Sequence, residues 1–292
     1  MGRYKSILKA AARHAGLDVR KASDFWPVDH TRTAWSHPLE LLSGSGCRDV
    51  LLNVSLDSVR FQSLHAFVAD HNGASPFIKT ITDYVEGRCT TYRGSRLEAF
   101  YESCQPRTPS AFMQLPTSVQ PWLHDLPAIA SILPWVDKTP QDRFDAVCYW
   151  TEKDNIEHGT HLTMEDGCQH FGPVSKRKGE LEFERLIKIT ESIRTNGFKV
   201  DPRGDDNIWV FLLLDGDEYR FHQEGGGNHR LAALAALGYK KATVQIKTRH
   251  IARKQEAKWW PTVRKGYLTE QEAVAVFDRI FRGDSIILDH CV

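Results

Sequence analysis

The sequence has few of the features that mark a metal-thiolate, disulfide-stabilised or membrane-spanning protein. Its 292 residues include six cysteines that are far apart, and no two of them form a Cys-x-x-Cys pair. This spacing excludes a thiolate zinc knuckle and argues against a framework of disulfides. The chain also lacks a secretory signal and any apolar run near the length of about 18 residues that a membrane-spanning helix needs. We therefore expect a cytoplasmic protein without a transmembrane segment.

A dominant charge is also missing. The chain has 38 Lys and Arg residues against 37 Asp and Glu residues, a net charge of +1, so nothing global draws it to nucleic acid or to an acidic membrane. One local excess stands out, because the nine basic residues between Lys240 and Lys265 are opposed only by Glu256. Such a run either forms a solvent-exposed face or attracts an anionic ligand.

The segment from Glu224 to Gly238 is the most informative in the chain. Three glycines run into Asn-His-Arg and then into a helix-forming stretch that stops at Gly238. A glycine-rich turn at a helix start leaves backbone N–H groups unpaired beside the positive end of the helix dipole. The pattern predicts a phosphate site, the alternative being a turn that only changes chain direction. Its residues are Gly225, Gly226, Gly227, Asn228, His229 and Arg230.

The surrounding pattern predicts an α/β chain, of the α+β kind, with a small mixed sheet. Apolar residues 208–214 read as a buried strand, 215–218 as a turn, and 219–223 and 242–247 as further strands. Residues 179–196 have helical periodicity and end at an Asn-Gly stop. Thr269 and Glu272 form a capping box that opens another helix, and residues 251–260 are expected to be helical up to Pro261.

The first half of the chain is less regular. We expect an amphipathic helix through residues 7–15, an apolar run at 50–54 and a helix over 95–103. Seven prolines between residues 105 and 140 exclude long helices and central strands there. We therefore predict a mostly irregular accessory region, 1–145, packed on a nucleotide-binding domain with a C-terminal helix, 146–292.

Together these residues carry a family likeness. The helix Glu180–Arg194, the two strands after it, Gly-Gly-Asn-His-Arg-Leu-Ala-Ala at 226–233 and the closing strand resemble the ParB/sulfiredoxin-like superfamily over roughly residues 168–250. Phe-Gly-Pro-Val-Ser at 171–175, with Trp-Pro-Thr-Val-Arg at 260–264 and Ala-Val-Phe-Asp-Arg at 275–279, is similar to a bacterial ParB-like branch found among cell-surface polysaccharide genes. The resemblance implies a nucleotide-binding fold.

The resemblance also implies particular contacts. The glycine loop would wrap the phosphates of a nucleoside triphosphate, which we expect to be ATP, with CTP as the alternative and Mg²⁺ as the accompanying ion. Arg185 and Lys188 are implied as second-side phosphate contacts. Ser175, in the turn before the helix, is implied as a contact to a substrate hydroxyl or to a metal-bound water.

Three departures from the superfamily narrow the chemistry. Asn228 stands where sulfiredoxins carry the reactive cysteine, which excludes sulfinic acid reduction because that chemistry needs an attacking sulfur. Gly226 stands where the free-serine kinases carry an aspartate, so a catalytic base must come from elsewhere. The residues after 250 do not read as a helix-turn-helix, which the chromosome-partitioning members have.

Glu224, Glu180 and His229 are the predicted catalytic residues. The two glutamates are candidate bases because one adjoins the phosphate loop and the other lies at a helix start, where a favourable dipole interaction is the alternative explanation. Further base candidates are Glu182, Glu184, Asp154 and Glu157. The histidine-rich stretch 157–161, with Asp166 and His170, is expected to be a polar loop rather than a metal site, since it lacks a His-Glu-x-x-His pattern.

These observations predict a nucleotide-dependent, kinase-like phosphotransferase that acts on a small hydroxyl-bearing acceptor, with a sugar in surface polysaccharide biosynthesis as one candidate. Phosphoryl transfer mainly needs fixed phosphates, neutralised charge and a group that orients the acceptor. One alternative is a non-catalytic nucleotide-binding sensor or assembly module. A second is a DNA-binding or nuclease-like ParB protein, which the near-neutral charge disfavours. The expected partners are the nucleotide and the acceptor, and a homodimer is compatible with the sequence.

Overall fold

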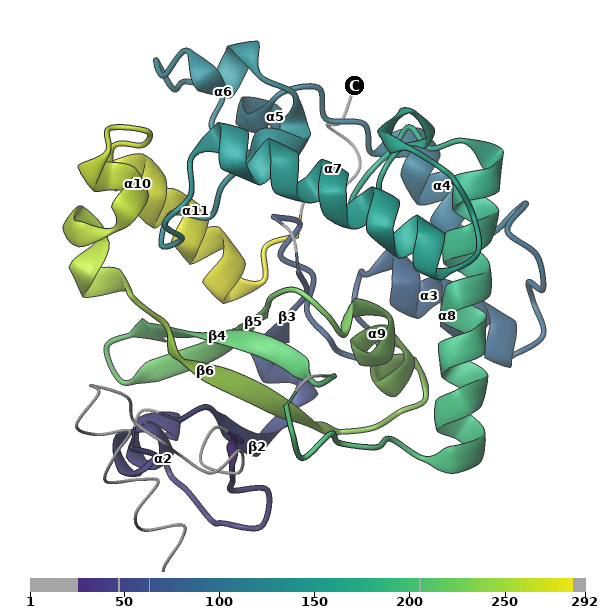
Figure 1. The fold of residues 1–292 in the computed structure, drawn as a ribbon, viewed down its shortest axis with the longest axis horizontal. Helices are drawn as coiled ribbons and strands as arrows, with labels where there is room; N and C mark the ends of the chain where they lie inside the picture. Colours follow the sequence, from purple (N-terminus) through teal and green to yellow (C-terminus); the bar gives the residue numbers. More distant parts are fainter. Residues whose placement is uncertain (1–25, 47, 63, 205, 286–292) are drawn as a thin grey trace, which may run out of the picture.

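The computed structural model describes residues 26–46, 48–62, 64–204 and 206–285, so the helix expected over residues 7–15 lies outside the described residues. One six-stranded sheet forms the centre of the described chain, in the order β1-β2-β6-β4-β5-β3 (Figure 1). The strands are β1 (Val28–Asp29), β2 (Val50–Ser55), β3 (Val59–Arg60), β4 (Ile208–Asp215), β5 (Glu218–Gln223) and β6 (Lys241–Arg253).

The sheet is mixed, as the sequence predicts. β4 and β5 form an antiparallel hairpin, β6 lies antiparallel to β2 but parallel to β4, and β3 lies parallel to β5. The chain returns from β5 to β6 through helix α9 (Asn228–Ala236), whose leucines and alanines are almost all buried. β4 is apolar on both faces because it lies inside the sheet with layers on each side.

Helices pack mainly on one side of the sheet. In Figure 1, α5, α6, α7, α10 and α11 lie on one side of β4–β6, and α2 lies on the other. Five helices have proline in their first turn, where its missing N–H costs nothing. The helices besides α9 are α2 (Pro38–Gly44), α3 (Pro76–Val85), α4 (Arg96–Ser103), α5 (Pro109–Met113), α6 (Trp122–Asp125), α7 (Pro140–Glu157), α8 (Lys176–Asn196), α10 (Pro261–Arg264) and α11 (Glu270–Arg282).

Several local predictions are confirmed. The helix expected over 179–196 is α8, the helix over 95–103 is α4, and the capping box of Thr269 and Glu272 opens α11. The helix expected over 251–260 is wrong in its first part, because β6 continues to Arg253 by pairing residues 251–253 with 212–214 of β4. A 3₁₀ helix, Lys254–Trp259, follows, and Pro261 begins α10 instead of ending a helix.

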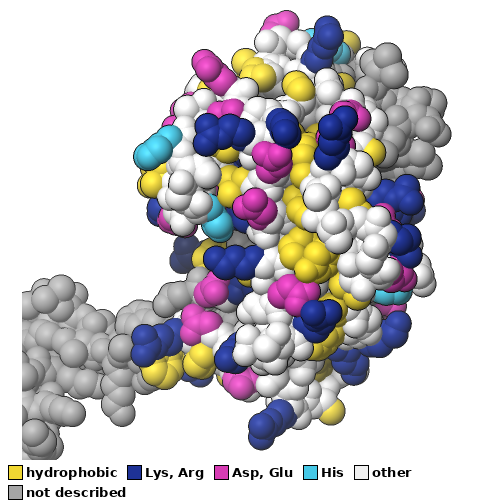
Figure 2. Space-filling view, turned by 90° about the vertical axis from the view of Figure 1, so that its right-hand side faces the viewer, with side chains coloured by type: hydrophobic (Ala, Val, Ile, Leu, Met, Phe, Trp, Pro, Cys, Tyr) yellow, Lys and Arg dark blue, Asp and Glu magenta, His cyan; other side chains and the backbone are white. Residues whose placement is uncertain are grey.

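The first half of the chain contributes directly to the sheet. β1, β2 and β3 all precede residue 61 and flank the hairpin and β6 on either side. The predicted boundary near residue 145 falls inside α7. None of the described helices is both long enough and apolar enough to cross a bilayer. On the side that carries α3 and α8, basic and acidic side chains are interspersed (Figure 2).

Helix α8 packs so closely on the loop before α4 that a side chain at Gly179 would have to displace the ring of Tyr92. A Cβ added at Gly179 would lie 2.1 Å from Cζ of Tyr92, whose side chain is buried. The last residue of α2, Gly44, has no neighbour within 4 Å of such a Cβ.

We expect Gly179→Ala to lower the free energy of unfolding by about 1–3 kcal/mol, because the buried Tyr92 ring must move. Gly44→Ala is the matched control and should raise stability by a few tenths of a kcal/mol, since alanine is the better helix former. Urea unfolding of both variants measures the difference. A neutral or stabilising Gly179→Ala would contradict the packing described here.

Candidate functional site

The predicted phosphate loop connects the end of β5 to the start of α9. Gly225 and Gly227 have φ angles of +68° and +101°, a region that favours glycine. A Cβ at Gly227 would also lie 3.0 Å from Cα of Ile208. Side-chain amide Nε2 of Gln223 donates to the carbonyls of Gly225 and Gly226 at 2.9 and 3.0 Å. The positive φ angles of Gly225 and Gly227 and the two hydrogen bonds from Gln223 therefore determine the shape of the loop.

The backbone N–H groups of this loop are free in the described structure. No hydrogen bond from the described residues reaches the N–H groups of Gly225, Gly226, Gly227 or Asn228, and no side chain caps the helix. Gly225 and Gly226 are exposed. Free N–H groups at the positive end of a helix are a ready anion site.

The two predicted side-chain donors are already engaged. Arg230 Nη2 lies 2.8 Å from Oδ1 of Asp206, and Nη1 donates to the Asp206 carbonyl. His229 Nε2 lies 3.0 Å from Oε2 of Glu182. Asp206 is 80% exposed, so an incoming phosphate can compete with it for Arg230, whereas the partner of His229 is fully buried.

Glu182 is the centre of a buried ionic network that joins α8 to α9. Lys178 Nζ and Arg185 Nη1 lie 2.7 and 3.0 Å from its carboxylate, and Arg185 also pairs with Asp154 at 2.5 Å. Burial alone would raise the pKa of Glu182, but the hydrogen bond to His229 and the charges of Arg185 and Lys178 lower it. Burial lowers the pKa of His229, which therefore donates to the carboxylate as a neutral imidazole. Arg185, implied as a phosphate contact, thus belongs to this network.

The other residues predicted on α8 lie apart from the loop. Ser175 is the N-cap of α8 and accepts from the N–H of Lys178. Glu180 pairs with Lys176 one turn earlier, and Lys188 is exposed. None of these three predicted residues borders either hollow near the loop.

A hollow opens beside Glu224. It contains about 690 Å³ of space outside the atoms, part of it open to solvent. The carboxyl ends of β3 and β5 meet here because these strands are parallel neighbours, which brings Gln62 next to Gln223 and Glu224. Helix α7 and residues 128–138 form the opposite wall. Ligands of open α/β sheets commonly bind at this kind of edge.

A smaller hollow lies at the other end of the loop. Asn228 borders it, and it shares Gln62 and His170 with the larger one. Oδ1 of Asn228 and Oε1 of Gln62 are buried acceptors without a hydrogen-bond partner in the described structure. The two ends of the loop, at Glu224 and Asn228, therefore each border a hollow. The unpartnered amide oxygens of Asn228 and Gln62 could accept hydrogen bonds from a ligand bound there.

Glu224 is held by a residue that the sequence did not single out. His250 Nδ1 lies 2.8 Å from Glu224 Oε2, and the His250 ring stacks on Phe211 with centroids 4.3 Å apart. Burial would raise the pKa of Glu224, but His250 and nearby cations lower it, so the carboxylate is ionised. No local signal marks His250, since its contact depends on β6 lying beside β4.

Comparisons of the chain with protein-family models, with curated proteins and with solved structures give no match. The superfamily resemblance therefore stays an expectation. Among the described residues, no group of three or more His, Cys, Asp or Glu side chains is placed to hold a metal ion. Within the histidine-rich stretch, His158 Nδ1 contacts the Asp154 carbonyl at 2.8 Å.

Two histidines next to the hollows, the buried His65 and the half-buried His170, predict acid sensitivity. Burial lowers the pKa of His65 to about 4 and that of His170 to about 3. Because the unfolded chain takes up these protons near pH 6.5, stability should fall as pH drops from about 6.5 towards 4. We expect His65 alone to account for a loss on the order of 2–3 kcal/mol.

Urea unfolding at pH 7, 5.5 and 4.5 measures this dependence. His65→Gln should flatten the curve over that range, while the same change at the exposed His124 should leave its slope unaltered. Equal slopes for wild type and His65→Gln would contradict the assignment.

Proposed function

We propose that the protein is a nucleotide-dependent phosphotransferase that acts on a small hydroxyl-bearing acceptor. One observation carries the proposal: a row of free N–H groups at the start of α9 directly follows Glu224, an ionised carboxylate that borders a hollow. The N–H groups suit the phosphates of ATP or CTP, and the hollow suits the acceptor.

The nucleotide phosphates would occupy the loop from Gly225 to Asn228. Arg230 would reach them by exchanging its exposed partner Asp206 for a phosphate, a bidentate contact for which arginine is suited. Mg²⁺, when bound with the nucleotide, supplies neutralisation of the phosphate charge.

Glu224 would accept the proton of the acceptor hydroxyl while that oxygen bonds to the terminal phosphorus and the bond to the leaving diphosphate breaks. His250 would hold the carboxylate in place. The lowered pKa of Glu224 makes it a weak base, which suffices because the transition state of phosphoryl transfer is loose and asks mainly for positioning. Gln62, whose Oε1 has no hydrogen-bond partner in the described structure, offers an amide to a further hydroxyl, as a sugar acceptor would present.

A second candidate is a nucleotide-binding module without turnover. It is favoured by the engagement of both side-chain donors of the loop, Arg230 with Asp206 and His229 with Glu182. In that case the exchange of Asp206 for phosphate would be a signal to the neighbouring Asn207, whose Oδ1 accepts from the N–H of Asp201. Turnover separates the two candidates.

Nucleic-acid binding through the basic run 240–265 has less support. Lys254 pairs with Asp215 and Asp278 at 2.9 and 2.8 Å, and Lys265 pairs with Asp137. These carboxylates reduce the charge that the run presents.

Nucleotide binding is tested by titration calorimetry and thermal shift with ATP and CTP, with and without Mg²⁺. Binding to the folded state raises the melting temperature by mass action. Arg230→Ala should weaken binding about tenfold or more, the loss of a charge-assisted contact worth roughly 1.4 kcal/mol. Arg249→Ala, an exposed change in the same basic run, should have no effect. Equal losses in both variants would argue against the loop.

The catalytic role of Glu224 is tested with Glu224→Gln. We expect phosphate transfer to fall about 10²-fold to 10⁴-fold while nucleotide affinity stays the same, the pattern for loss of a general base. Glu218→Gln, at the exposed start of β5, the strand that ends just before Glu224, is the matched control. A wild-type protein that binds nucleotide but transfers phosphate to no hydroxyl acceptor would favour the module without turnover.

A further inference from the structure

Arg143 in α7 is a cation that faces the larger hollow without a counter-charge. It is half-buried and borders the hollow, and in the described structure its guanidinium makes no ion pair or hydrogen bond. Other buried arginines differ: Arg60 donates to the carbonyls of Asp57 and Phe281, and Arg279 donates to that of Leu64.

An unpaired charge in such a position is costly unless a ligand compensates it. Burial lowers the pKa of Arg143, against the smaller opposing influence of Cys168 and Glu224. The Glu224 carboxylate borders the same hollow but forms no ion pair with Arg143 in the described structure, and it contacts His250 instead.

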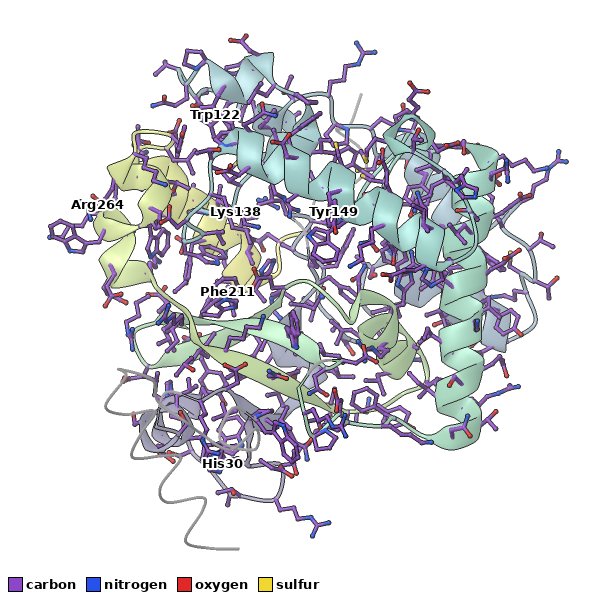
Figure 3. The ribbon with its side chains drawn as sticks, in the orientation of Figure 1. His30, Trp122, Lys138, Tyr149, Phe211 and Arg264 are labelled. Atoms are coloured by element: carbon purple, nitrogen blue, oxygen red, sulfur yellow. The ribbon has the colours of Figure 1, made fainter. Side chains whose placement is uncertain are left out.

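The ionic side chains around the hollow have an excess of one positive charge, which one acidic group of a ligand would neutralise. The hollow is also lined by Lys138, which is exposed and lies just ahead of α7 (Figure 3). Arg143 and Lys138 thus stand against Glu224 alone. His170 adds no charge near neutral pH, because burial lowers its pKa to about 3.

The remaining wall is apolar. Ile129, Leu133 and Val136, in the segment that precedes Lys138, are half-buried and border the hollow. A molecule that bridges from Glu224 to Arg143 would therefore have a hydroxyl at one end, an acidic group at the other, and a carbon skeleton between them.

We propose that the acceptor bound in this hollow carries a carboxylate or phosphate that the Arg143 guanidinium holds, as in an acidic or phosphorylated sugar. The inference rests on the proposed phosphotransferase, in that it names the class of its acceptor. Arg143 is a substrate-binding residue in this scheme and takes no part in proton transfer.

Three matched probes test it by titration calorimetry: glucose, glucuronate and glucose 6-phosphate. At least one of the two acidic probes should bind wild type at least tenfold more tightly than glucose. The acidic probe that binds more tightly shows whether the site prefers a carboxylate or a phosphate. Arg143→Gln should reduce that affinity to the level of glucose, and Arg143→Lys should keep part of it. Arg177→Gln, an exposed change at the start of α8, should leave it unchanged.

Folding supplies an independent reading. Since the native guanidinium lacks a partner, Arg143→Gln should keep or raise the melting temperature of the free protein. Replacing an arginine with a structural role would lower it.

Acidic probes that bind no better than glucose, or do not bind, overturn the inference, as does full affinity in Arg143→Gln. Nucleotide affinity is measured separately. Acidic probes bound without any nucleotide binding would overturn only the proposed function, and transfer to neutral acceptors alone would overturn only this inference.

Discussion

One buried carboxylate holds the candidate site together. Glu182 is completely inaccessible and touches Lys178, Arg185 and His229, which come from two helices. Removing a single partner would leave a charge uncompensated in a medium where that costs several kcal/mol. Because His229 lies in the first turn of α9, this contact fixes where the helix begins, and so determines where the free N–H groups before it point.

The sheet adds the second constraint. β3 and β5 are parallel neighbours, although about 160 positions separate their paired residues in the sequence, as for Val59 and Phe221. Their shared end brings Gln62 beside the segment that leads into the glycines. Residues from both halves of the chain, Gln62 and Gln223, therefore line one side of the hollow. Helix α7 and the proline-containing stretch before it line the opposite side.

Local sequence signals predicted much of the fold and part of the candidate site. The β4–β5 hairpin, α8, the glycine loop and the capping box of α11 follow from short-range patterns, and the structure has them. The extension of β6 depends on pairing with β4, which no window of residues 251–253 reveals. Likewise, the partners of Arg230 and Glu224 are a distant aspartate and histidine, and the isolation of Arg143 shows only once its surroundings are assembled.

The amide of Gln223 has a consequence for the energetics of recognition. By donating to the carbonyls of Gly225 and Gly226, it turns the opposite edge of those peptide groups, their N–H donors, outward before any ligand arrives. Glycine-rich segments ordinarily lose much conformational freedom when they close on a guest. Here two hydrogen bonds and two glycines with positive φ already set the backbone in the free protein, so part of that loss precedes the binding of an anion.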